Sequence, residues 1–212
     1  MARRVICISR VLGAGGGDIG RMVADQLEYR FVDEEIVQQA AESEGVSVEE
    51  LADVERRRTF LDRILHGLSL AGGADGYMVG VAGVAPPALS GIDAGSLRAL
   101  IQKSIHETAE RGEVVIVSHA ASFALAGRSD VLRVLVTAST DTRASRAAAD
   151  GALDDKQASK LIADDDAGRA SYLKRFYGVS AELPTHYDLA INTDSISTDL
   201  IVDLIARATS AD

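Results

Sequence analysis

Hydrophobic residues occur along this chain in short runs that are separated by longer amphipathic segments. Short runs without a polar break are typical of strands buried on both faces, and apolar residues three and four positions apart are typical of helices packed on one side. The predicted strands are 5–8, 30–32, 114–117, 131–136 and 189–191. The predicted helices are 18–28, 34–43, a segment opening at 47–51, 96–111, 140–150, 154–177 and 197–208.

The alternation of strands and helices predicts an α/β sandwich built on a five-stranded parallel sheet. We expect residues 1–212 to form a single domain, with an irregular, glycine-punctuated insertion at 67–95. Ligands of such sheets bind at the carboxyl ends of the strands. The candidates at those ends are a glycine-rich loop after residue 8, Asp33, Ser118 with His119, and Asn192 with Thr193.

Composition narrows the classes of function. The net charge is −10, which argues against a general binder of nucleic acid or of anionic membranes. No apolar stretch approaches the roughly 20 residues of a membrane span, and Met1 leads almost directly into the first strand rather than into a secretory leader. We therefore expect a cytoplasmic protein whose partners are small molecules, although the sequence allows a homodimer. The single cysteine, Cys7, is expected to be a buried core thiol.

The loop at 13–17, Gly-Ala-Gly-Gly-Gly, follows the first strand and precedes the first predicted helix. Glycines at such a corner let backbone N–H groups converge on an anion, and the helix N-terminus adds a favourable dipole, so phosphate is the expected guest. One interpretation is a phosphate-binding P-loop. The pattern G-x-x-x-x-G-K-[ST] is incomplete, because Arg10 stands for its first glycine, Gly16 for its lysine and Gly17 for its hydroxyl residue.

Two other interpretations of the loop remain open. Residues 15–20 satisfy G-x-G-x-x-G, and Asp33 lies where a ribose-binding acid of a dinucleotide site belongs. However, the first glycine of that fingerprint normally follows its strand almost directly, whereas six residues, 9–14, intervene here. The third interpretation is a glycine-rich turn that binds nothing.

Three ordered segments carry a resemblance to a known family. They are Ile8-Ser9-Arg10 with Gly13-Ala14-Gly15-Gly16 and the following 29–36, then 164–178 with its arginines, then Tyr187-Asp188-Leu189-Ala190-Ile191-Asn192-Thr193. Together they resemble the cytidylate kinase-like family, a branch of the P-loop nucleoside monophosphate kinases. The resemblance covers most of the chain, is weakest at 67–95, and implies a three-layer P-loop sandwich with a helical lid at 140–178.

The resemblance implies transfer of a phosphoryl group from ATP, with Mg²⁺, to a nucleoside monophosphate, with CMP or dCMP as the first candidate. The residues that it implies for the donor nucleotide are Ser9, Arg10, Gly13, Gly15, Gly16 and Gly17 for the phosphates, Asp18 for Mg²⁺, and Asn192 and Thr193 near the base. Those implied for the acceptor are Asp33, Arg57, Arg58 and His119. The implied catalytic lid arginines are Arg143, Arg146, Arg169 and Arg175.

Two departures from the family pattern bear on activity. The segment after the third strand reads Ser118-His119-Ala120 where relatives often have Gly-Arg-Gly, and Gly17 stands where they often have a polar or basic residue. With the lysine also missing, the predicted site has lost positive charge. This favours weak nucleotide affinity or altered substrate choice. It keeps open a catalytically inactive regulator that binds a nucleotide or a partner protein, and a dinucleotide-dependent oxidoreductase stays the second alternative.

Overall fold

The computed structural model describes residues 3–33, 94–117, 120–149 and 153–210. Several predictions fall outside these residues. They concern the helices within 34–51, most of the insertion at 67–95, and Arg57, Arg58 and His119. Among the helices of the described part, none is long and apolar enough to cross a membrane.

The described strands form one five-stranded parallel sheet in the order β2-β3-β1-β4-β5. The strands are β1 (Val5–Arg10), β2 (Arg30–Val32), β3 (Val114–Val117), β4 (Val131–Thr137) and β5 (Leu189–Asn192). The predicted sheet is therefore confirmed, with β1 at its centre, where it pairs with β3 on one side and β4 on the other. β1 continues to Arg10, two residues beyond the predicted end, because Ser9 and Arg10 still pair with β4.

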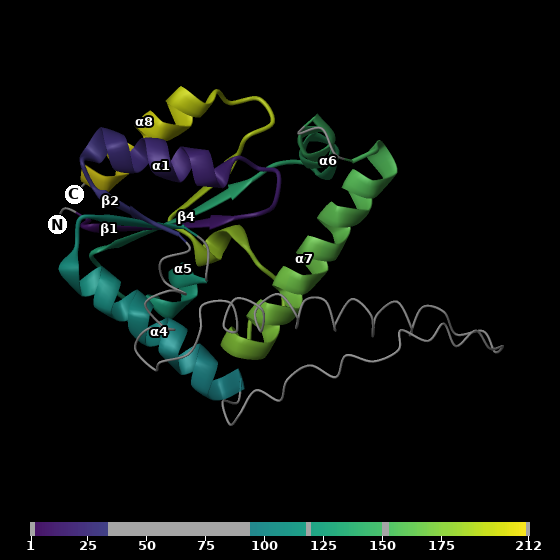
Figure 1. The fold of residues 1–212 in the computed structure, drawn as a ribbon. Coiled ribbons are helices and arrows are strands. Elements are labelled where there is room, and N and C mark those ends of the chain that lie inside the picture. Colours follow the sequence, from purple (N-terminus) through teal and green to yellow (C-terminus); the bar gives the residue numbers. More distant parts are fainter. Residues whose placement is uncertain (1–2, 34–93, 118–119, 150–152, 211–212) are drawn as a thin grey trace.

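Helices cover both faces of this sheet (Figure 1). The first face carries α1 (Gly16–Leu27) and α8 (Thr198–Ser210), and the second carries α4 (Ala94–Arg111) and the short α5 (Ala121–Ala124). Successive residues of β1 point to opposite faces, so Ile6 and Ile8 pack under α1 and α8, whereas Val5 and Cys7 pack on the side of α4. Cys7 is fully buried, which confirms a core thiol, and this burial raises its pKa to about 12.

Two further helices lie beyond the carboxyl ends of β1 and β4 (Figure 1). α6 (Thr140–Ala149) follows β4, and α7 (Asp155–Tyr177) packs against it. α7 begins with a capping box between Asp154 and Gln157 and ends at Gly178 in the left-handed conformation. A short 3₁₀ helix, η1 (Pro184–His186), then leads into β5. This arrangement places α7 beside the loop between β1 and α1.

Candidate functional site

The glycine loop connects β1 to α1 at the carboxyl edge of the sheet. Gly13 and Gly15 both have φ of +78°, a left-handed conformation that favours glycine, and Gly15 is the N-cap of α1. A Cβ atom at Gly15 would have no neighbour within 4 Å, so the loop is open on that side. The first N–H groups of α1, at Gly16, Gly17 and Asp18, have no carbonyl partner within the helix. N–H groups of this kind at the start of a helix can bind an anion such as phosphate.

Arg143 of α6 supports the loop from beneath. Its side chain is buried; Nε donates to the carbonyl oxygen of Leu12 at 2.6 Å, and Nη1 and Nη2 donate to the two carboxylate oxygens of Asp166 at 2.9 and 2.7 Å. A Cβ at Gly13 would lie 2.8 Å from the carbonyl oxygen of Arg143. The close approach of α6 thus requires glycine at position 13, and Arg143 joins the loop to α7.

Arg146, one turn further along α6, joins the loop to the end of β5. Its Nη1 donates to Thr193 Oγ1 at 2.8 Å and to the Gly13 carbonyl oxygen at 3.3 Å, and its Nη2 donates to the Thr193 carbonyl oxygen at 2.9 Å. The Thr193 hydroxyl in turn donates to the carbonyl oxygen of Ala14 at 3.1 Å. Because both arginines donate to carbonyl oxygens of the loop, Arg143 and Arg146 hold the shape of the loop in this structure.

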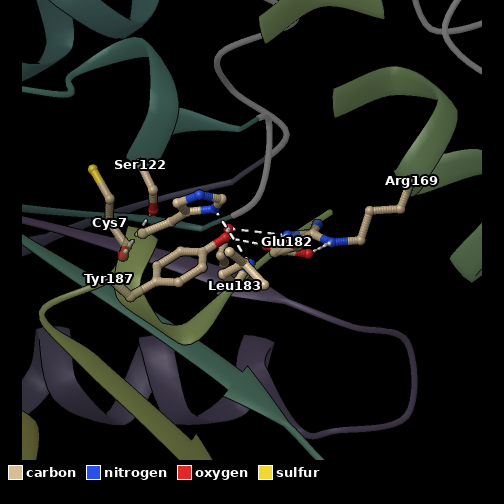
Figure 2. A network of polar contacts seen from close by, with 8 residues as sticks. Cys7, Ser122, Arg169, Glu182, Leu183 and Tyr187 are labelled. Carbon is tan, nitrogen blue, oxygen red and sulfur yellow. Dashed lines mark hydrogen bonds and ion pairs between the residues drawn. The ribbon is translucent and has the colours of Figure 1, made fainter. Parts of the chain in front are cut away.

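Arg169 of α7 reaches the end of β1 through a polar network (Figure 2). Its Nη2 donates to Ser9 Oγ at 3.1 Å, and its Nε and Nη2 donate to the two Glu182 carboxylate oxygens at 2.8 and 2.6 Å. The Tyr187 hydroxyl donates to Glu182 and lies 3.1 Å from Ser9 Oγ. These four side chains connect α7, the segment before η1 and the carboxyl end of β1.

The protonation states of this network follow from its burial and charges. Burial alone would raise the pKa of Glu182, but the hydrogen bond and charge of Arg169 outweigh it and hold the pKa below its ordinary value. Burial, together with the neighbouring Glu182 carboxylate, raises the pKa of Tyr187 well above its ordinary value. At neutral pH the network is therefore an Arg169–Glu182 ion pair with a protonated tyrosine beside it.

A cavity of about 270 Å³ lies between the loop and α7. Its lining includes Val11 from the loop, Arg143, Asp166 and Arg169 from the two helices, and Glu182. A small molecule bound here would meet polar groups already arranged as two ion pairs.

The structure brings many of the predicted site residues together around the loop. These are Ser9, Arg10, Gly13, Gly15, Gly16, Gly17, Arg143, Arg146, Arg169 and Thr193. Asp33 joins them through an ion pair, in which its Oδ2 lies 3.4 Å from Nη2 of Arg10.

The structure also places three further predicted residues. Asp18 lies exposed in the first turn of α1; Mg²⁺ at phosphate sites commonly takes only one or two carboxylates from the protein, and this position suits such a role. The Asn192 side chain is hydrogen-bonded to Asp194. Arg175 lies over the ring of Phe176 near the end of α7, and among the residues described no hydrogen bond joins it to the loop.

Sequence reasoning missed Asp166, Glu182 and Tyr187 as members of the site. In the sequence, Tyr187 belongs only to the segment of the last strand. Asp166 is one of three consecutive aspartates, and consecutive residues of a helix point in different directions. The partners of Arg143 and Arg169 depend on how α6, α7 and the 179–187 segment pack. No spacing in the sequence expresses that packing.

This sheet order, with a glycine loop between β1 and α1 and arginines from α6 and α7 beside it, defines an α/β protein with the fold of the P-loop kinases. Solved structures with this fold include an uncharacterised protein from Eubacterium ventriosum, with a TM-score of 0.66, 15% identity and 98% of each chain covered. A shikimate kinase from Bacteroides thetaiotaomicron gives a TM-score of 0.54 at 16% identity, covering 96% of this chain and 97% of that one. A gluconokinase from Sinorhizobium meliloti gives 0.51 at 13% identity, covering 98% and 93%.

Sequence comparison identifies the family. The model of the cytidylate kinase-like family matches residues 5–195, so this chain belongs to that family. A cytidylate kinase from Ignicoccus hospitalis is 24% identical over 204 residues, which are 96% of this chain and 97% of that protein. The resemblance inferred from the three sequence segments is confirmed, as is the P-loop kinase type of fold.

Proposed function

We propose that this protein transfers the terminal phosphoryl group of ATP to a small acceptor at the glycine loop. Bound Mg²⁺ would neutralise charge on the donor phosphates, as it does in phosphoryl transfer generally. The backbone amides at the start of α1 would hold the phosphate tail, and Arg169 would stabilise charge that develops beyond the end of β1. The family and the fold support this class of reaction.

One observation carries the proposal. The loop is left open at Gly15, where a Cβ would meet nothing within 4 Å, although Arg143 and Arg146 hold the carbonyl oxygens of Leu12 and Gly13. With its carbonyls turned to these two guanidinium groups, the loop is preorganised to present N–H groups to an anion.

For the acceptor we propose a nucleoside monophosphate, with CMP or dCMP first. The support is the family and the name of the relative from Ignicoccus hospitalis. Shikimate and gluconate are the competing acceptors to test, because kinases named for them share the fold.

A catalytically inactive nucleotide-binding regulator is the second candidate. It is favoured by Gly16 in the lysine position and by the ion pairs that already engage Arg143 and Arg169. The dinucleotide-dependent oxidoreductase loses support, because β1 here lies between β3 and β4, whereas in the dinucleotide-binding fold it lies between β2 and β4.

A coupled assay of ADP release tests the proposal. The protein would be mixed with MgATP and, separately, with CMP, dCMP, UMP, AMP, GMP, shikimate and gluconate. We expect ADP release that requires both Mg²⁺ and an acceptor and is fastest with CMP or dCMP. Binding of MgATP by calorimetry without ADP release for any acceptor would favour the regulator. Absence of both binding and ADP release would reject the proposal.

A pair of matched variants locates the activity. Gly15→Asn keeps a residue type that tolerates a left-handed backbone but fills the opening with a side chain. Gly127→Asn is the control, because Gly127 also has positive φ and open space but precedes the amino end of β4, at the opposite edge of the sheet. We expect the first variant to lose MgATP binding and the second to retain it.

A further inference from the structure

The lysine of a P-loop would occupy position 16, and the surroundings of Gly16 have no room for a side chain. A Cβ built on Gly16 would lie 2.6 Å from Cβ of Arg10 and 3.4 Å from Cβ of Val136. Contacts below 3.0 Å between such atoms require a shift of the backbone. The side chain that uses this space is that of Arg10, which stands at the position of the pattern's first glycine.

The Arg10 side chain extends from the end of β1 across the first turn of α1. Its Nη1 lies 3.2 Å from the position that a Cβ of Gly17 would take. Its Nη2 lies 3.4 Å from Oδ2 of Asp33, just past the end of β2, and the Arg10 side chain is 41% exposed. The guanidinium therefore lies next to Gly17 in the first turn of α1, and the side chain is partly exposed.

We propose that Arg10 supplies to the donor phosphates the positive charge that the missing lysine would supply. It does so from the end of β1, whereas the lysine would stand at the start of α1. The proposal rests on the proposed function of the loop as a nucleotide site. A guanidinium is always charged and can bind two phosphate oxygens at once, so it can replace an ammonium group in this role. Asp33 positions the guanidinium and links it to the end of β2.

This role also explains two of the three consecutive glycines. Gly15 leaves the loop open to the anion, whereas Gly16 and Gly17 leave room for the side chain of Arg10. A lysine at position 16 and an arginine at position 10 exclude each other sterically. Arg10 thus carries the positive charge in place of a lysine at position 16.

Calorimetric binding of AMP, ADP and ATP, each with Mg²⁺ and at fixed ionic strength, tests the proposal. Arg10→Met keeps a long apolar stem and removes the charge, and Arg10→Lys keeps the charge. We expect Arg10→Met to weaken ATP binding about tenfold to a hundredfold, the range of one charge-assisted hydrogen bond. AMP binding should change little, because the P-loop lysine faces the β- and γ-phosphates. Arg10→Lys should retain most of the affinity.

The control is Arg21→Ala, which removes an exposed cation from α1 whose guanidinium lies over the Phe31 ring. It should leave ATP affinity unchanged. A swap adds a second test: Arg10→Gly with Gly16→Lys should regain the affinity that Arg10→Gly loses, whereas Gly16→Lys alone should lower the melting temperature. Where the double variant does not fold, Arg10→Met against Arg10→Lys decides.

Three results would overturn the inference. ATP affinity of Arg10→Met equal to that of the wild type would do so while leaving the proposed function standing. An equal loss for AMP, ADP and ATP would show that the guanidinium does not act on the phosphate tail. Wild-type protein that binds none of the three nucleotides would remove the proposed function, and the inference with it.

Discussion

Arg169 has two partners that imply different roles, since Glu182 neutralises it and Ser9 connects it to the end of β1. Arg169→Ala removes the cation and leaves the partly buried Glu182 carboxylate without its ion pair, so we expect a loss of about 1–3 kcal/mol in unfolding free energy. If Arg169 also stabilises the transferred group, turnover should fall at least about a hundredfold.

Glu182→Gln separates these two roles. It breaks the same ion pair and should also lower stability in a urea titration, but it keeps the arginine and should retain most of the turnover. Equal losses of turnover in both variants would show that Arg169 acts only by supporting the fold.

The sequence placed these residues only in part. The resemblance supplied Arg143, Arg146 and Arg169 as candidates, and each lies beside the loop. Their partners could not be foreseen, because the choice of Asp166 over its two neighbours depends on how α6 and α7 cross. The close approach of Arg10 to Gly16 likewise depends on how α1 packs against the end of β1, which no sequence pattern expresses.

At the scale of the elements, the glycine loop packs closely against α6 at Gly13. Gly13→Ala would place a Cβ 2.8 Å from the Arg143 carbonyl oxygen at a φ of +78°, so it combines steric overlap with backbone strain. We expect a loss of about 2–4 kcal/mol in urea-induced unfolding. Gly127→Ala, at a φ of +88° with open space, carries only the strain and should lose about 1 kcal/mol. Equal losses would show that α6 does not press on the loop.

The junction of β4 and β5 depends on Asp188, which accepts from the backbone and guanidinium of Arg133 at 2.8–3.3 Å and pairs with Arg3 at 3.3 Å. Burial alone would raise the pKa of Asp188, but the hydrogen bonds and charge of Arg133, together with the charge of Arg3, hold it below its ordinary value of 3.8. Asp188 therefore stabilises the fold above pH 3.8, and this stabilisation disappears as the pH falls through the folded-state pKa.

Asp188→Asn should consequently lower the unfolding free energy by about 1–2 kcal/mol at pH 7. The gap to the wild type should close as the pH falls below about 4. Asp25→Asn, which removes an exposed carboxylate from α1, is the control and should show a much smaller gap. A gap of equal size at pH 7 and pH 3 would contradict this assignment.

The elements themselves were largely predictable. Unbroken apolar runs located the five strands, and amphipathic spacing located α1, α6, α7 and α8 within a few residues. α1 begins at Gly16, two residues before its predicted start. The prediction began too late because glycine has a low helix propensity, so Gly16 and Gly17 do not indicate a helix. α5 and η1 were missed, since four and three residues are too few for a helical period to appear.

At the scale of the whole molecule, the sequence predicted a parallel sheet but not the order of its strands. That order places β1 at the centre, so its loop lies between the ends of β3 and β4 and beside α6. The same chain elements in another order would separate Arg10 from Asp33 and Ser9 from Arg169. The site is a property of the topology as much as of the motif.

The central claim is that backbone amides of the glycine loop hold the phosphate tail of a nucleotide. Amide resonances of ¹⁵N-labelled protein, followed while MgATP is added, test it most directly. We predict the largest shifts at Gly13, Gly15, Gly16, Gly17 and Asp18, with the amide of Gly127 unmoved. Unchanged loop resonances at a MgATP concentration that shifts amides elsewhere would contradict the account.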